Sequence, residues 1–229
     1  MISNEDKKID RLFETLLKEG EITLIYGDHG TGKTCICFLA TLKYIKNKFK
    51  VIYITTEIPF TVERIIQLTE KDTMKYVRNL FENIIVITPK TFMEQNNLIK
   101  RIEYYISPAV KLLIFDSITD KYREVTSKKE VTILANKILN EQMGLLKYIA
   151  INRGIAVLIT GQLTEAIKRG CQDVVASKVI RYWCDKIIKL ERLDNIRYLI
   201  TEKCGEAEIN KRIPIPFKIV EGGIVIGDN

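Results

Sequence analysis

Long apolar runs are missing from this sequence of 229 residues, and none approaches the roughly 18–20 residues that span a bilayer. Residues 1–11 (MISNEDKKIDR) are charged and lack the apolar core of a secretory signal. Internal repeats, low-complexity tracts and linkers rich in proline and glycine are lacking too. We therefore expect no membrane or secretory segment, and a cytoplasmic chain that forms a single domain over residues 1–229.

Residues with the spacing of a metal site are also lacking. The five cysteines are odd in number and form no ligand-like pairs, because Cys35 and Cys37 would lie on different faces of one helix. We expect free, buried thiols in a reducing compartment. The single tryptophan, Trp183, lies beside Tyr182. We expect this pair in the core or at an interface rather than as a platform for base stacking.

Acidic residues are outnumbered, since 36 Lys and Arg against 29 Asp and Glu give a net charge of +7. The surplus is spread along the chain, with its maximum between Lys100 and Arg153. A surface of this charge permits binding to nucleic acid, but an ordinary solvated basic surface is an equally good interpretation.

One strong motif is present, GDHGTGKT at residues 27–34, between an apolar run and an apolar helix-like segment. Its spacing is that of the phosphate-binding P-loop, in which glycines let backbone N–H groups face the phosphates. A helix that begins at Lys33 would direct its positive end at them. The motif predicts ATP binding by Gly27, Asp28, His29, Gly30, Thr31, Gly32, Lys33, Thr34 and Cys35. We expect the side chain of His29 to point to solvent rather than to act as a base.

Hydrophobic periodicity predicts alternating strands and helices. The expected strands are 21–26, 51–56, 84–88, 112–116 and 155–160, and the expected helices are 33–46, 61–71, 91–105 and 129–152. In the last helix the expected core face is Val131, Leu134, Ile138, Met143, Leu146 and Ile149. Such alternation predicts an α/β fold with a mainly parallel sheet flanked by helices. Strands at 186–191, 196–202 and 213–220 would extend this sheet in antiparallel fashion.

Polar residues follow three of the expected strands, at the edge where the P-loop also lies. Asp116 would hold Mg²⁺ together with Thr34. Glu57 would orient or deprotonate the attacking water, although a surface glutamate is an equal alternative. Gln162 would contact the γ-phosphate, or else satisfy a loop backbone.

Taken together, these segments resemble the archaeal RadB proteins, single-domain paralogues of the RecA/RadA recombinases. The likeness covers Ile9 to Ile226, and it is carried by the segments EITLIYGDHGTGKT (21–34), VIYITTEIPFTVERI (51–65), LLIFDSITDKYRE (112–124), VLITGQL (157–163), KIIKLERLD (186–194) and LITEKCG (199–205). The resemblance implies a RecA-like P-loop NTPase core without an N-terminal helical DNA-binding domain.

The resemblance also implies roles for individual residues. It makes Glu57 the catalytic glutamate, with Lys33 on the phosphates, and it makes Gln162 the nucleotide-sensing glutamine. Arg64 would stack on adenine, and Lys203 would reach a nucleotide across a subunit interface. The resemblance implies two DNA-facing loops, 120–129 and 163–178. The implied contacts are Arg123, Lys128 and Lys129 on the first loop, and Lys168 and Arg169 on the second.

Three departures from the family pattern bear on function. The second loop is short, Gly161 stands where asparagine is usual, and Cys204-Gly205 replaces a His-Arg or Ser-Arg pair. We therefore expect no long filament, and a homodimer stays open. The expected function is slow ATP hydrolysis with Mg²⁺, weak to moderate binding of single-stranded DNA, and assistance to a full-length RadA-type recombinase. The alternatives are an ATP-gated regulatory module of the KaiC-like type, which acts through protein partners, and a P-loop kinase for a small molecule.

Overall fold

The computed structural model describes residues 4–57, 60–68, 74–126, 129–164, 172–194, 196–205, 207–208, 214–220 and 223–227. Its helices are α1 (Asn4–Leu16), α2 (Lys33–Lys46), α3 (Val62–Gln67), α4 (Met74–Asn83), α5 (Phe92–Arg101), the 3₁₀ helix η1 (Ile102–Tyr105), α6 (Asp120–Val125), α7 (Lys129–Arg153) and α8 (Ser177–Trp183). Its strands are β1 (Ile22–Gly27), β2 (Lys50–Thr55), β3 (Ile84–Ile87), β4 (Val110–Asp116), β5 (Ala156–Gln162), β6 (Lys186–Leu193), β7 (Ile196–Cys204), β8 (Ala207–Glu208), β9 (Ile215–Val220) and β10 (Gly223–Ile226).

All ten of these strands join one sheet, in the order β10-β9-β7-β6-β1-β5-β4-β2-β3, with β8 paired to β7. The strands from β3 to β6 in this order run parallel to one another. Strand β7 is antiparallel to β6, and β9 and β10 continue this antiparallel region. The expected fold is therefore confirmed, a mainly parallel sheet with a C-terminal antiparallel extension.

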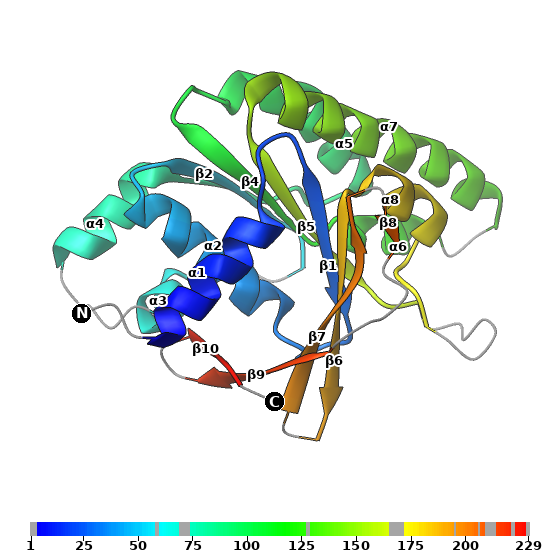
Figure 1. Ribbon diagram of the computed structural model, residues 1–229. Helices are drawn as coiled ribbons and strands as arrows, with labels where there is room; N and C mark the ends of the chain where they lie inside the picture. The colour runs from blue at the N-terminus through cyan, green and yellow to red at the C-terminus, as the bar shows by residue number, and fades with distance from the viewer. Residues whose placement is uncertain are drawn as a thin grey trace.

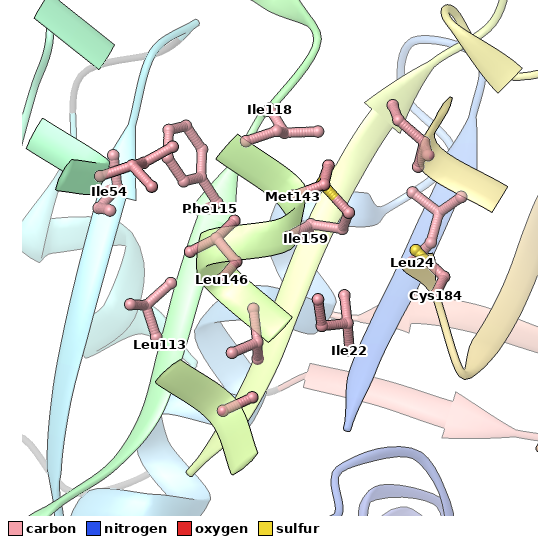
Figure 2. Close-up of a cluster of buried hydrophobic side chains, with 14 of the residues drawn as sticks. Ile22, Leu24, Ile54, Leu113, Phe115, Ile118, Met143, Leu146, Ile159 and Cys184 are labelled. Carbon is pink, nitrogen blue, oxygen red and sulfur yellow. The ribbon is translucent and has the colours of Figure 1, made fainter. Parts of the chain in front are cut away.

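Helices cover both faces of the sheet (Figure 1). Helices α5 and α7 lie over one face, where Met143 and Leu146 pack against Leu113, Phe115 and other strand side chains (Figure 2). Helices α1 and α2 pack in a second apolar cluster on the opposite face. Because successive strand residues point to opposite faces and helices cover both faces, the central strands β1, β4 and β5 are buried along almost their whole length rather than alternating.

The long helix α7 matches the predicted one in extent but not in its whole core face. Met143, Leu146 and Ile149 are buried as expected. Val131 and Leu134, by contrast, are exposed, because the first turns of α7 extend beyond the sheet that the later turns cover. The part of the prediction that concerned the N-terminal turns is therefore wrong.

The structure also tests the predictions about the cysteines and about the aromatic pair at 182–183. Cys35, Cys37 and Cys184 are free and buried, as expected, whereas Cys204 is exposed because it ends strand β7 beside a turn; Cys171 lies outside the described residues. Of the aromatic pair, Tyr182 is exposed. In the part of the chain that the structure describes, no helix is both long and apolar enough to cross a bilayer.

Candidate nucleotide site

The P-loop joins the end of β1 to the start of α2. Gly30 and Gly32 have φ angles of 71° and 106°, a left-handed backbone that favours glycine, as the motif predicted. Gly27 is held close to β6, since an added Cβ would lie 2.4 Å from the carbonyl oxygen of Leu190. The hydroxyl of Thr31 donates to the carbonyl of residue 28 at 2.7 Å and so closes the loop.

Lys33 occupies the centre of this loop. Its Nζ donates to the carbonyl oxygens of Gly27 and Asp28 at 2.9 and 2.8 Å. Burial lowers the pKa of Lys33, while the nearby carboxylates of Glu57, Asp116 and Asp28 act in the opposite direction. The ammonium group is thus preorganised on backbone carbonyls, within the field of the two acids that the sequence placed at strand ends.

Asp116 ends β4 and is buried. Its Oδ1 accepts a hydrogen bond from the Thr160 hydroxyl at 2.6 Å, and its Oδ2 accepts one from the Tyr53 hydroxyl at 2.9 Å. Burial and the charge of Asp116 raise the pKa of Tyr53 well above its usual value, so this phenol remains a donor. The two bonds fix the carboxylate while each oxygen keeps a lone pair.

The residues near Asp116 fit a magnesium ion. Among the described residues no group of three or more His, Cys, Asp or Glu side chains forms a cage. Mg²⁺ does not require one, because it keeps several waters and takes one or two carboxylates together with substrate phosphates. The oriented carboxylate of Asp116 is an oxygen ligand of this kind, and the hydroxyl of Thr34 would be a second one.

Glu57 follows β2 and lies near the loop tip. Its Oε1 is 3.5 Å from Nδ1 of His29, whose side chain is 75% exposed, as expected. In the sheet, β5 and β4 lie between β1 and β2, so Glu57 does not follow a strand next to the P-loop strand. Glu57 nevertheless faces the site, since it contributes to the electrostatic environment of Lys33.

Gln162, at the end of β5, is bonded to a residue that the sequence placed on the first DNA-facing loop. Its Oε1 accepts a hydrogen bond from Nη1 of Arg123 in α6. Its backbone N–H donates to the hydroxyl of Thr119 at 3.1 Å. The two predicted roles, nucleotide sensing and DNA contact, thus fall on side chains that touch each other.

The glycine before Gln162 has a steric explanation. A Cβ on Gly161 would lie 2.6 Å from Cγ2 of Val174, so the asparagine that is usual in the family has no room. Val174 forms a β-bridge with Leu163 and thereby closes the base of the second loop.

The remaining predicted residues are more scattered. Arg64 in α3 is exposed and donates to Gln67 at 3.3 Å. Lys203 lies on β7 opposite Ile187, away from the P-loop of its own chain, and donates to the carbonyl of Cys184 at 2.6 Å. Lys129 begins α7, and its side chain is not described. The predicted contacts outside the described residues are Lys128, Lys168 and Arg169.

Sequence reasoning missed two groups near the site. The first is a polar network behind the P-loop strand, in which Arg181 donates to Tyr26, Glu202 and Asp173. The second is a pair of arginines on the β6–β7 hairpin beside the loop tip. Neither group has a motif. Only the alternation of charged and apolar residues along the two strands marks the arginines.

Comparison with known proteins shows the family to which this chain belongs. The Rad51 family model matches residues 1–211. The chain is 33% identical over 219 residues to the DNA repair and recombination protein RadB of Methanococcus maripaludis, covering 95% of this chain and 97% of that protein. With RadB of Methanocaldococcus jannaschii it shares 34% identity, covering 92% and 95%. A crystal structure of the RadB recombinase aligns with a TM-score of 0.77 at 25% identity over 98% of both chains. The chain therefore belongs to the Rad51 family and, within it, to the RadB proteins.

Proposed function

We propose that this chain binds and slowly hydrolyses ATP with Mg²⁺, binds single-stranded DNA in a nucleotide-dependent way, and assists a full-length RadA-type recombinase in DNA repair. The observation that carries the proposal is the position of Lys33. Its ammonium group is held by two P-loop carbonyls and faces the carboxylates of Glu57 and Asp116. When a triphosphate binds in this loop, the ammonium group of Lys33 would donate to its β- and γ-phosphate oxygens in place of the two carbonyls.

Each residue around Lys33 has one task in this proposal. The loop N–H groups and the N-terminus of α2 bind phosphate oxygens. Asp116 and Thr34 hold Mg²⁺, which neutralises charge on the phosphates when bound. Glu57 accepts a proton from the attacking water or orients it. Its exposed neighbour His29 is close enough to influence this carboxylate, but the loop tip leaves it open to solvent.

The contact between Gln162 and Arg123 supports coupling between nucleotide and DNA. Arg123 donates to Oε1 of Gln162, whereas a γ-phosphate oxygen would accept from Nε2, so the amide would have to turn away from Arg123 when it binds the phosphate. Arg123 would then be released toward the DNA backbone, to which it adds a salt-dependent contact. ATP binding and DNA affinity would rise together by this exchange.

The names of the relatives support the biological role. They are called DNA repair and recombination proteins, and the aligned structure is called a recombinase. The short second loop and the glycine at 161 depart from the pattern of the full recombinases. We therefore assign this chain a helper role without long filaments, with a homodimer as the self-assembly to test and a RadA-type protein as its partner in the cytoplasm.

Fluorescence anisotropy with a labelled single-stranded oligonucleotide tests the proposal directly. The chain is titrated with and without a non-hydrolysable ATP analogue and Mg²⁺, at two salt concentrations. Lys33→Ala should lose the nucleotide effect. Glu57→Gln should keep it while losing ATP turnover, which is measured separately by phosphate release. Arg123→Ala should weaken DNA binding and lower the salt slope by roughly one counterion.

The outcomes separate the parts of the proposal. Nucleotide-dependent, salt-sensitive binding supports it. DNA binding that ignores the nucleotide would contradict the coupling through Gln162. Nucleotide binding without any DNA binding would contradict the repair role and favour a regulatory module whose output is a protein partner. Unchanged turnover in Glu57→Gln would remove Glu57 as the base.

A further inference from the structure

Two arginines of the β6–β7 hairpin lie beside the P-loop. The strand register places Arg192 of β6 directly opposite Arg197 of β7, so both side chains leave the same face of the sheet. Leu190 and Leu199, two residues from each, pack in the apolar cluster with α2. Both guanidinium groups therefore project on the α2 side, past the point where Gly27 ends β1 beside Leu190.

Both arginines reach the tip of the P-loop. Nε of Arg197 donates to the carbonyl oxygen of Gly30 at 3.2 Å. A Cβ on Gly30 would lie 3.8 Å from Nη1 of Arg192. The outward-facing side of the loop is therefore bordered by two positive charges in addition to the ammonium group of Lys33.

These charges have no acidic partner among the described residues. Nε of Arg192 donates to the backbone carbonyl of Asp194 at 2.9 Å, which does not neutralise it. On the same strand Lys189, by contrast, pairs with Glu191 at 2.6 Å and is neutralised. Like charges directly opposite each other on neighbouring strands are unfavourable. A pair of this kind beside a phosphate-binding loop indicates an anion that is supplied from outside the fold.

The position of the arginines suggests which anion. Cys35, in the first turn of α2, feels the positive charges of both Arg64 and Arg197, which act against the burial that raises its pKa to about 11. Arg64 belongs to α3, which follows β2 on one side of β1, and Arg197 belongs to β7 on the other side. Cations thus stand on both sides of the helix N-terminus at which phosphates bind.

We propose that Arg197 and Arg192 form a second cationic wall of the nucleotide site and bind the phosphates of a nucleoside polyphosphate from the side opposite Arg64. The inference rests on the nucleotide binding proposed above. Arg197 uses Nε on the loop, which leaves the other N–H groups of its planar fork for phosphate oxygens. Arg192 adds a second charge and gains, on ligand binding, relief from its repulsion with Arg197.

In this arrangement the two arginines repel each other in the free protein but both attract the phosphates in the bound protein. In the free protein, replacing Arg192 with alanine removes a like-charge contact, so thermal stability should stay the same or rise. In the bound protein the same change removes attraction to the phosphates, so affinity should fall. A residue that only braces the fold would lower stability and affinity together.

The test is isothermal titration calorimetry of the full chain with a non-hydrolysable ATP analogue and Mg²⁺, with thermal unfolding of each free protein measured alongside. Arg197→Ala should weaken binding roughly ten- to a hundred-fold, the range of one charge-assisted hydrogen bond. Arg192→Ala should weaken it roughly three- to ten-fold, as expected for a more distant charge. Arg153→Ala is the matched control, because it removes an exposed guanidinium that pairs with Glu103 far from the loop. Lys33→Ala reports on the nucleotide site itself.

The outcomes keep this inference apart from the proposed function. If the natural chain binds the analogue and both hairpin variants bind it equally well, the second wall is wrong and nucleotide binding stands. If the natural chain fails to bind the analogue, the proposed function fails. Loss of free-state stability in proportion to lost affinity would overturn the inference in favour of bracing. If the variants keep their affinity for the nucleotide but bind DNA more weakly when no nucleotide is present, the two arginines are DNA contacts. This result would overturn the inference as well.

Discussion

Removing the guanidinium of Arg181 should destabilise the protein more than any exposed ion pair would. Arg181 donates to Tyr26 at 2.9 Å and to Glu202, and it binds Asp173 through Nε at 3.0 Å. The Glu202 side chain is only 4% exposed, whereas that of Arg181 is 29% exposed. Arg181→Met would leave the Glu202 carboxylate buried without the guanidinium that now pairs with it.

The expected cost follows from this burial. Breaking a fully buried pair costs about 3–5 kcal/mol, and the partial exposure of Arg181 reduces this to about 2–4 kcal/mol. For a chain of this size each kcal/mol lowers Tm by roughly 2–4 °C, so we expect a fall of about 4–16 °C. Urea unfolding followed by circular dichroism, with a thermal scan beside it, measures both quantities.

A double-mutant cycle makes the reasoning refutable. Glu202→Gln alone should cost less, because Arg181 retains Asp173. The double variant Arg181→Met/Glu202→Gln should be more stable than the sum of the single changes predicts, since both single changes remove the same ion pair. Arg153→Met, which breaks an exposed pair with Glu103, should cost at most about 1 kcal/mol. A cost below about 1 kcal/mol for Arg181→Met, or strict additivity in the cycle, would refute the argument.

Two further changes test the close contact at Gly161 and the buried tyrosines. Gly161→Ala should lower the free energy of unfolding by about 1–3 kcal/mol through overpacking against Val174. Adding Val174→Ala to this variant should recover part of that loss. If urea unfolding shows that Gly161→Ala is as stable as the natural chain, the steric explanation is contradicted. Burial raises the pKa of Tyr26 and of Tyr53, so above about pH 10 the unfolded chain releases protons that the folded chain keeps. Stability should therefore fall with rising pH by up to about 1.4 kcal/mol per pH unit for each tyrosine, and Tyr26→Phe should make this slope shallower.

Much of the site could be predicted from sequence because a parallel sheet gathers the carboxyl ends of its strands at one edge. Asp116, Gln162 and the P-loop each follow an apolar run, and that position alone brings them together. The sheet order could not be read in the same way. Helical crossovers of similar length allow more than one order, so the sequence did not predict that β5 lies between β1 and β4.

Arg192 and Arg197 escaped prediction for a different reason. Their contacts with Gly30 depend on the register of the β6–β7 hairpin and on the pairing of β6 with β1. Neither of these is encoded in a local motif. Val131 and Leu134 failed because periodicity identifies an apolar stripe but not the length of sheet that is available to cover it. Local patterns thus predicted the elements and the shared edge, whereas contacts made by the late strands needed the tertiary structure.

The strands beside the P-loop are synthesised long after the P-loop itself. Arg197 meets the loop carbonyl of Gly30 across 167 residues of chain, and Phe217 and Ile219 of β9 lie against Gly32. On the ribosome the P-loop emerges early, while the strands that line its outer side emerge only after nearly all the rest has been made. A nascent chain would therefore carry the P-loop without these strands beside it, and the tight nucleotide binding proposed above would begin only once the hairpin and β9 have joined the sheet. Nucleotide retention by ribosome-stalled chains of increasing length would then rise in one late step.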